Sequence, residues 1–191
     1  MAVNNILLVG VGGQGTITAA KLLTLGLMEA GYDVKMSEIH GMSQRGGSVS
    51  SQVRYGDAVQ SPIIEKGTAD IIVAFETMEA MRYLDYLKPE GTLIVNTAEI
   101  APMPVIIGAA DYADNILGAL KERAAVKAMD ATAIAREMGN ERITNVVLMG
   151  TIIKAMGLDA IDWDAIIDSN VKPKFVELNK QALRKGMAMV E

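Results

Sequence analysis

The chain has 191 residues, of which 50% are apolar and 21% charged, so intrinsic disorder is excluded and one domain with a full hydrophobic core is expected. Its 23 acidic residues outnumber its 18 lysines and arginines, giving a formal net charge of −5, so nucleic-acid binding through a basic surface is not expected. The chain contains no cysteine and one histidine, His40, which excludes disulfides, thiolate nucleophiles and iron–sulfur ligation by this chain and leaves little acid–base chemistry near neutral pH.

The N-terminal part of the chain predicts a strand, a tight turn, a helix and a second strand. The apolar run 5–9 enters a glycine cluster at 10–15, which is typical of a buried parallel strand followed by a sharp turn. Apolar residues at helical spacing then predict a helix that ends at Gly31, and 32–37 has the pattern of a strand. These elements together predict a first β-α-β unit.

The next segment departs from a regular alternation of strands and helices. Residues 38–48 are too few and too rich in glycine for a crossover helix, and 48–55 again has the pattern of a strand. We therefore expect the strands at 32–37 and 48–55 to be antiparallel, or to be separated by a long functional loop, rather than to be parallel neighbours.

The alternation resumes further along the chain. Strands are predicted at 70–74, 92–96 and 125–129, helices at 76–87, 114–123, 145–156, 163–168 and 173–189, and a short turn at 134–138. No linker or internal repeat divides the sequence, so we expect one α/β domain, residues 1–191, with a mostly parallel sheet and a helical C-terminal layer. The uncharged first 20 residues lack a basic start and are interrupted by glycines. Neither a targeting segment nor a membrane span is expected, and the expected compartment is the cytoplasm.

The glycine cluster has the spacing of a dinucleotide-binding fingerprint. Gly10-x-Gly12-x-x-Gly15 follows a predicted strand and precedes a predicted helix, so a phosphate could approach the helix N-terminus. Glu38 follows the second strand, where an acid that binds ribose would lie. The alternative is a tight turn whose glycines serve only close packing of helix and sheet. The candidate binding residues of this turn are Gly10, Gly12, Gly13, Gln14 and Gly15.

A second candidate site is the segment from 37 to 48. It combines the histidine, an arginine, three glycines and several hydroxyl and amide side chains, a composition typical of a binding loop. The alternative is a long mobile loop with a solvated arginine. Its candidate residues are Glu38, His40, Gly41, Ser43, Gln44, Arg45, Gly46 and Gly47.

These segments also carry a family resemblance. Gly-Val-Gly-Gly-Gln-Gly at 10–15 and Glu-x-His-Gly-Met-Ser-Gln-Arg-Gly-Gly at 38–47 resemble the gamma-type subunit of the 2-oxoacid:ferredoxin oxidoreductases, most closely those of indolepyruvate type. The resemblance extends to 145–150 and to 179–182 ahead of Gly186.

The resemblance implies a Rossmann-like domain that does not use NAD and is inactive alone. It implies a large partner subunit that holds thiamine diphosphate, Mg and iron–sulfur clusters, so that this chain alone binds no cofactor. It further implies oxidative decarboxylation of a 2-oxoacid such as indolepyruvate or another aryl pyruvate, with coenzyme A as co-substrate and electrons passing through the complex to ferredoxin. The 38–47 segment would then lie near coenzyme A or thiamine diphosphate, or at the subunit interface.

Two other classes of function stay open from the residues alone. A free-standing NAD-binding dehydrogenase or reductase would use the glycine fingerprint and Glu38, although the missing second crossover helix counts against it. A non-enzymatic nucleotide-binding module would explain the small number of catalytic side chains but not the composition of the 38–47 segment.

Overall fold

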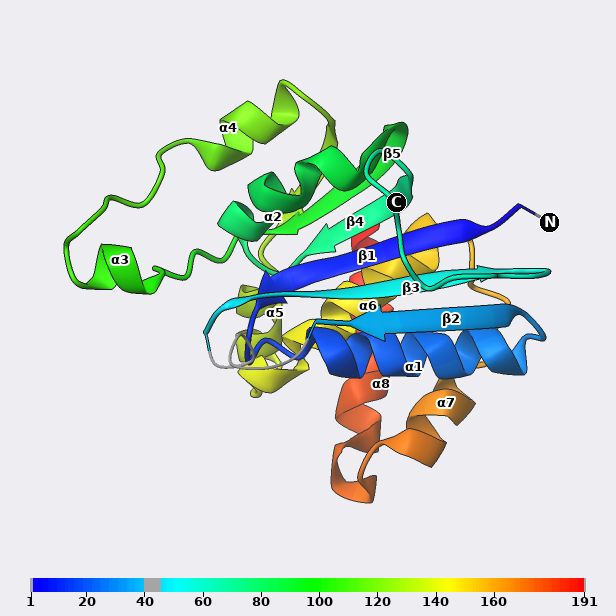
Figure 1. Ribbon diagram of the computed structural model, residues 1–191. Helices are drawn as coiled ribbons and strands as arrows, with labels where there is room; N and C mark the ends of the chain where they lie inside the picture. The colour runs from blue at the N-terminus through cyan, green and yellow to red at the C-terminus, as the bar shows by residue number, and fades with distance from the viewer. Residues whose placement is uncertain (1, 40–45, 191) are drawn as a thin grey trace.

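The sheet is built around β1 (Asn4–Val11), in which every residue after Asn4 is buried because helices cover both faces. The computed structural model describes residues 2–39 and 46–190, and within them six strands form one sheet in the order β2-β3-β1-β4-β5-β6 (Figure 1). The other strands are β2 (Asp33–Glu38), β3 (Ser48–Gly56), β4 (Ala69–Ala74), β5 (Leu87–Asn96) and β6 (Ala125–Met129).

The sheet is mostly parallel, as the sequence predicts. β1, β4, β5 and β6 pair in parallel, whereas β3 is antiparallel to both of its neighbours, β1 and β2. Of the two arrangements expected for the second and third strands, antiparallel pairing is the one observed. The expected β-α-β unit differs in one respect, because β3 lies between β1 and β2 and the two parallel strands do not touch.

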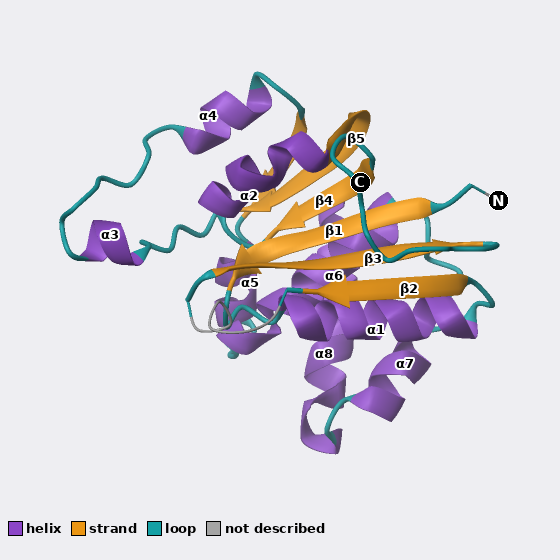
Figure 2. Ribbon diagram, viewed as in Figure 1, coloured by secondary structure: helices purple, strands orange, loops and turns teal. Residues whose placement is uncertain are grey.

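Helices cover the two faces of the sheet unequally (Figure 2). One face carries α1, α5, α6, α7 and α8, whose apolar side chains form one core with Ile6, Leu8 and Val73 of the sheet. The other face carries α2 and α4, which pack on Leu7, Val9 and neighbouring residues. Helix bounds are α1 (Thr16–Glu29), α2 (Thr77–Tyr83), α3 (Met103–Ile106), α4 (Ile116–Lys121), α5 (Ala131–Glu137), α6 (Thr144–Ala155), α7 (Trp163–Asn170) and α8 (Val176–Met187), with 3-10 turns at Leu84–Tyr86, Glu141–Ile143, Pro173–Phe175 and Ala188–Val190.

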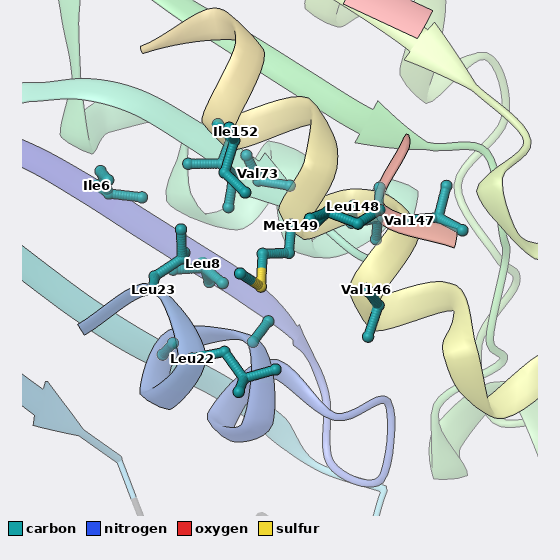
Figure 3. Close-up of a cluster of buried hydrophobic side chains, with 14 of the residues drawn as sticks. Ile6, Leu8, Leu22, Leu23, Val73, Val146, Val147, Leu148, Met149 and Ile152 are labelled. Carbon is teal, nitrogen blue, oxygen red and sulfur yellow. The ribbon is translucent and has the colours of Figure 1, made fainter. Parts of the chain in front are cut away.

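The larger core is organised by α6, which is buried from Thr144 to Ile153 and contacts β4, α1, α5 and α8. Figure 3 shows Val146, Met149 and Ile152 of this helix among side chains of β1, β4 and α1. The expected helical C-terminal layer is thus present on one face of the sheet.

Glycines let α6 and α8 approach closely. A Cβ at Gly186 would lie 1.8 Å from the carbonyl oxygen of Val147, and a Cβ at Gly150 would lie 2.2 Å from that of Leu183. Since carbon and oxygen cannot approach within such distances, any side chain here would push the two helices apart.

Several predicted boundaries shift by a few residues, and the largest difference lies between the predicted helix 76–87 and the predicted strand 92–96. The predicted helix 76–87 ends as α2 at Tyr83 and continues as a 3-10 turn, so β5 already begins at Leu87. Its first residue pairs with Ala69 of β4, but the register shifts before Thr92 pairs with Ile71. Pro89, which has no N–H to donate, lies within this irregular stretch. No helix in the described part of the chain is long and apolar enough to cross a membrane.

Candidate functional site

The candidate site lies at the carboxyl ends of β1 and β4. The connection after β1 leads to α1 on one face of the sheet, and the connection after β4 leads to α2 on the other face (Figure 1). Open α/β sheets bind ligands at such a switch point, because the diverging connections leave a crevice there.

The glycine-rich turn is held in place by the amide of Gln14. The Val11 N–H donates to Gln14 Oε1 at 2.7 Å, and Gln14 Nε2 donates to the carbonyl oxygen of Phe75 at 2.9 Å. A Cβ at Gly10 would lie 2.9 Å from both Gln14 Oε1 and Phe75 Cβ, so this close packing requires glycine. Gln14, a predicted binding residue, is thus engaged in joining the ends of β1 and β4.

The turn is joined to the end of the second candidate segment by two backbone hydrogen bonds. The Gly12 N–H donates to the carbonyl oxygen of Gly47 at 2.8 Å, and the Gly46 N–H donates to that of Gly12 at 3.2 Å. On the other side of the segment, the Ile39 N–H donates to the carbonyl oxygen of Ser50 at 3.0 Å. The structure therefore brings the two predicted motifs together. The predicted residues His40, Gly41, Ser43, Gln44 and Arg45 lie outside the described residues.

The N-terminus of α1 borders a hollow of about 250 Å³. Its walls come from Gly12, Gly13, Gly15, the first helical turn at 16–18, and Val49 of β3. The first N–H groups of a helix lack carbonyl partners within the helix, and the helix dipole places partial positive charge there. The hollow can therefore hold a small anionic group such as a phosphate or carboxylate. Its volume matches only part of a large cofactor.

Gly15 shapes this helix start and is supported from α6. Its φ of 85° is in the left-handed region, which glycine adopts without a steric penalty. Asn145 Nδ2 donates to the Gly15 carbonyl oxygen at 3.4 Å, and a Cβ at Gly15 would come within 2.8 Å of the same nitrogen. Asn145 lies in one of the segments that carry the family resemblance, and this contact gives it a role in positioning the turn.

The structure places Glu38 away from the position of a ribose-binding acid. Glu38 ends β2 at the edge of the sheet, and β3 separates it from β1. Two strand spacings, about 10 Å, therefore lie between the backbones of β2 and β1. The Gly12 backbone, which would approach a pyrophosphate in a dinucleotide site, is already paired with Gly46 and Gly47.

Two buried carboxylates next to the turn were not among the predicted residues. Glu76, 1% exposed, precedes α2 and caps its N-terminus by accepting from the Glu79 N–H at 2.8 Å. Glu79, 4% exposed, accepts from the Ser48 hydroxyl and from Arg82 Nε, the latter at 3.1 Å. Ser48 directly follows the second motif, so Glu79 anchors that end of the segment. The signal in the sequence is a Glu-x-x-Glu pattern after an apolar strand, which has the spacing of a capping box with Glu in place of the usual Ser or Thr.

Glu76 also accepts a hydrogen bond from the Tyr112 hydroxyl, which lies 2.9 Å from the Thr77 hydroxyl. Burial, followed by the hydrogen bond to the Glu76 carboxylate, raises the pKa of Tyr112 well above its ordinary value. The phenol therefore keeps its proton throughout the physiological range and remains a donor to Glu76. Among residues 2–39 and 46–190, no three acidic or histidine side chains converge as metal ligands.

Comparison with known proteins identifies relatives over nearly the whole chain. The family model for pyruvate ferredoxin/flavodoxin oxidoreductase matches residues 5–189. The indolepyruvate oxidoreductase subunit IorB of Pyrococcus horikoshii is 42% identical over 189 residues, covering 96% of this chain and 94% of that protein. The pyruvate/ketoisovalerate oxidoreductases common subunit gamma of Pyrococcus furiosus is 29% identical over 189 residues, covering 95% and 94%.

Solved structures show the same fold. The gamma subunit of the keto/oxoacid ferredoxin oxidoreductase of Geobacter sulfurreducens has a TM-score of 0.72 at 22% identity and covers 98% of both chains. The 2-oxoglutarate:ferredoxin oxidoreductase of Magnetococcus marinus, solved with 2-oxoglutarate, coenzyme A and succinyl-CoA, has a TM-score of 0.75 at 20% identity. That similarity covers 100% of this chain and 31% of the other.

Proposed function

This chain belongs to the pyruvate ferredoxin/flavodoxin oxidoreductase family, as a subunit of a 2-oxoacid ferredoxin oxidoreductase, and we propose that it is the small subunit of an enzyme of indolepyruvate type. The 42% identity to an indolepyruvate oxidoreductase subunit supports this assignment over a pyruvate enzyme. The proposed reaction converts an aryl 2-oxoacid and coenzyme A into acyl-CoA and CO₂, releases one proton, and passes two electrons to oxidised ferredoxin.

The chemistry is divided between this chain and a large subunit. With no cysteine, this chain cannot ligate iron–sulfur clusters, so the clusters belong to the partner. We place thiamine diphosphate and its Mg on the same partner, where thiamine diphosphate supplies the electron sink for decarboxylation. The chain is inactive alone, acts in the cytoplasm and reaches ferredoxin only through the complex.

The role of this chain rests on one observation, the pairing of Gly12 with Gly46 and Gly47. It joins the glycine-rich turn and the end of the 38–47 segment at the carboxyl edge of the sheet, next to the hollow at α1. We propose that this joined surface faces the thiamine-bearing subunit and holds an anionic part of coenzyme A or of the 2-oxoacid. The first N–H groups of α1, which have no carbonyl partner within the helix, and the guanidinium of Arg45 suit such a group.

Reconstitution tests this proposal. The isolated chain is expected to be colourless and unable to reduce a viologen dye with indolepyruvate and coenzyme A, whereas addition of the large subunit encoded in the same genome restores turnover. Turnover by the isolated chain would contradict the division of chemistry.

Arg45 tests the proposed site itself. Arg45→Lys keeps the charge but loses the bidentate fork, so kcat/KM is expected to fall about 10- to 100-fold, which corresponds to a charge-assisted hydrogen bond of ~1.5–3 kcal/mol. Arg142→Lys, at an exposed arginine, is the matched control. A raised KM for coenzyme A or 2-oxoacid with an intact complex indicates a ligand role, and loss of the complex on gel filtration indicates an interface role. If Arg45→Ala changes neither assembly nor kinetics, the segment is only a connector.

A further inference from the structure

A short arm, residues 100–112, leaves the body of the molecule between β5 and α4 and carries α3 at its tip (Figure 1). It is internally ordered, since the Ile106 N–H donates to the Pro102 carbonyl oxygen and the Ala110 N–H to that of Pro104, both at 3.1 Å. Its tip is apolar and exposed. Met103, Ile106 and Ile107 are 65%, 66% and 69% exposed, and none of them belongs to either core.

Both ends of the arm are fixed to one buried carboxylate oxygen. The Ile100 N–H donates to Glu76 Oε1 at 3.2 Å, and the Tyr112 hydroxyl donates to the same oxygen. The Thr77 N–H adds a bond to the carbonyl oxygen of Ala98 at 3.1 Å. Exposing an apolar tip on a firmly held base is unfavourable in water. The free energy is recovered only when another surface covers the tip.

The base of the arm is linked directly to the candidate site. Phe75, which precedes Glu76, offers its carbonyl oxygen to Gln14 Nε2 at 2.9 Å and to Asn96 Nδ2 at 3.0 Å. The arm and the glycine-rich turn therefore start from the same edge of the sheet. A protein that approaches the turn with its cofactor also approaches the arm.

The charges around the arm indicate the chemistry of its partner. Glu99, Asp111 and Asp114 adjoin the two ends of the arm at its base and are exposed, and the sequence holds no lysine or arginine between Lys88 and Lys121. These acids favour a partner surface with lysine and arginine around an apolar pocket. They disfavour an anionic membrane, and they disfavour a second copy whose own acids would face them across a symmetric contact.

We propose that the arm docks this chain onto the large subunit, with Met103, Ile106 and Ile107 inserted in an apolar pocket that has a basic rim. This inference rests on the proposed function, because it takes the large subunit as the partner that approaches the glycine-rich turn. It adds a docking element that is separate from the site itself.

The test titrates the small subunit into a fixed amount of the large subunit and follows dye reduction. Ile106→Ser combined with Ile107→Ser is expected to raise the half-saturating concentration about tenfold or more, since two apolar anchors are lost, and to leave the plateau of turnover unchanged. The matched control is Met28→Ser combined with Ile63→Ser, two apolar side chains that are 57% and 52% exposed. Met28 lies near the end of α1 and Ile63 precedes β4. Both control positions are therefore on the side of the amino-terminal ends of the parallel strands, whereas the arm starts from their carboxyl ends. All variants are expected to unfold within about 1 °C of the parent, because exposed side chains contribute little to stability.

Asp111→Lys combined with Asp114→Lys is expected to raise the half-saturating concentration as well, most strongly at low salt. An unchanged half-saturating concentration for the isoleucine variant, or a lowered plateau without a change in half-saturation, overturns the docking role. A dimer of the isolated chain in sedimentation that the isoleucine variant abolishes also overturns it, because the arm then binds a second copy. If the unaltered chain gives no turnover with the large subunit, the proposed function itself fails.

Discussion

Gln14 offers a direct test of how the glycine-rich turn is held. Its side-chain amide connects the end of β1 to the end of β4, through the Val11 N–H and the Phe75 carbonyl oxygen. Gln14→Ala removes both hydrogen bonds and leaves the backbone otherwise unchanged. We therefore expect this substitution to destabilise the protein although Gln14 lies in a surface turn.

The expected loss of stability follows from the two bonds. An intramolecular hydrogen bond contributes about 0.5–1.5 kcal/mol net when its partners stay satisfied, whereas removing the partner of a buried donor costs about 1–3 kcal/mol. The Phe75 carbonyl oxygen keeps its bond from Asn96, but the N–H of the buried Val11 loses its acceptor, Gln14 Oε1. Gln14→Ala should therefore lower the free energy of unfolding by about 2–3 kcal/mol. For a chain of this size that lowers Tm by roughly 5–10 °C.

Thermal unfolding followed by circular dichroism measures this loss. Gln60→Ala, at an exposed position, is the matched control and should stay within about 0.5 kcal/mol of the parent. Gln14→Glu keeps an acceptor for Val11 but places a carboxylate oxygen against the Phe75 carbonyl oxygen, so it should not restore stability. A Tm for Gln14→Ala within about 1 °C of the parent would refute the bridging role.

Three further predictions address the helix contact, the pH dependence and the nucleotide. Gly186→Ala should lower the free energy of unfolding, measured in urea, by about 3 kcal/mol or more, because the added methyl group would collide with the Val147 carbonyl oxygen. An unaltered urea midpoint would show that α6 and α8 can separate without loss of stability. Burial, with smaller contributions from Tyr32 and Asp70, raises the pKa of Tyr55 to about 12 in the folded protein, above its unfolded value near 10. The free energy of unfolding should therefore fall as the pH rises from 10 towards 12. Tyr55→Phe should reduce that fall in unfolding titrations. Calorimetry should detect no micromolar binding of NAD, because the Gly12 backbone is paired and β3 separates Glu38 from β1; micromolar binding that Glu38→Ala abolishes would favour a dehydrogenase instead.

Local patterns in the sequence were sufficient to predict the main helices and strands of the fold. The apolar run of β1, the glycine turn and the end of α1 near Gly31 depend on neighbouring residues, and the structure confirms them. The connection between β2 and β3, which has no room for a crossover helix, also excluded parallel neighbours and left antiparallel pairing, which the structure shows, as one of two alternatives. The insertion of β3 between β1 and β2 was missed, because the order of strands depends on which distant segments pair.

The candidate site was predicted in its parts but not in its assembly. The sequence identified both glycine-rich motifs, yet the bonds between Gly12 and Gly46 or Gly47 join residues more than 30 positions apart. The bond between Glu76 and Tyr112 likewise spans 36 positions and leaves no periodic pattern. The apolar residues near Ile106 carry no local sign that they would be exposed. Such features arise from tertiary pairing, which a single sequence does not display.

The contact between α6 and α8 also determines how late this protein can finish folding during its synthesis. Ala182 and Leu183 of α8 complete the same core as Ile6 and Leu8, which lie more than 170 positions earlier in the chain. While residues after about 170 are still inside the ribosome, the side of α6 that α8 covers remains open to water. Translation that stops before Gly186 should therefore yield an aggregation-prone fragment with an uncovered apolar helix, rather than a smaller stable domain.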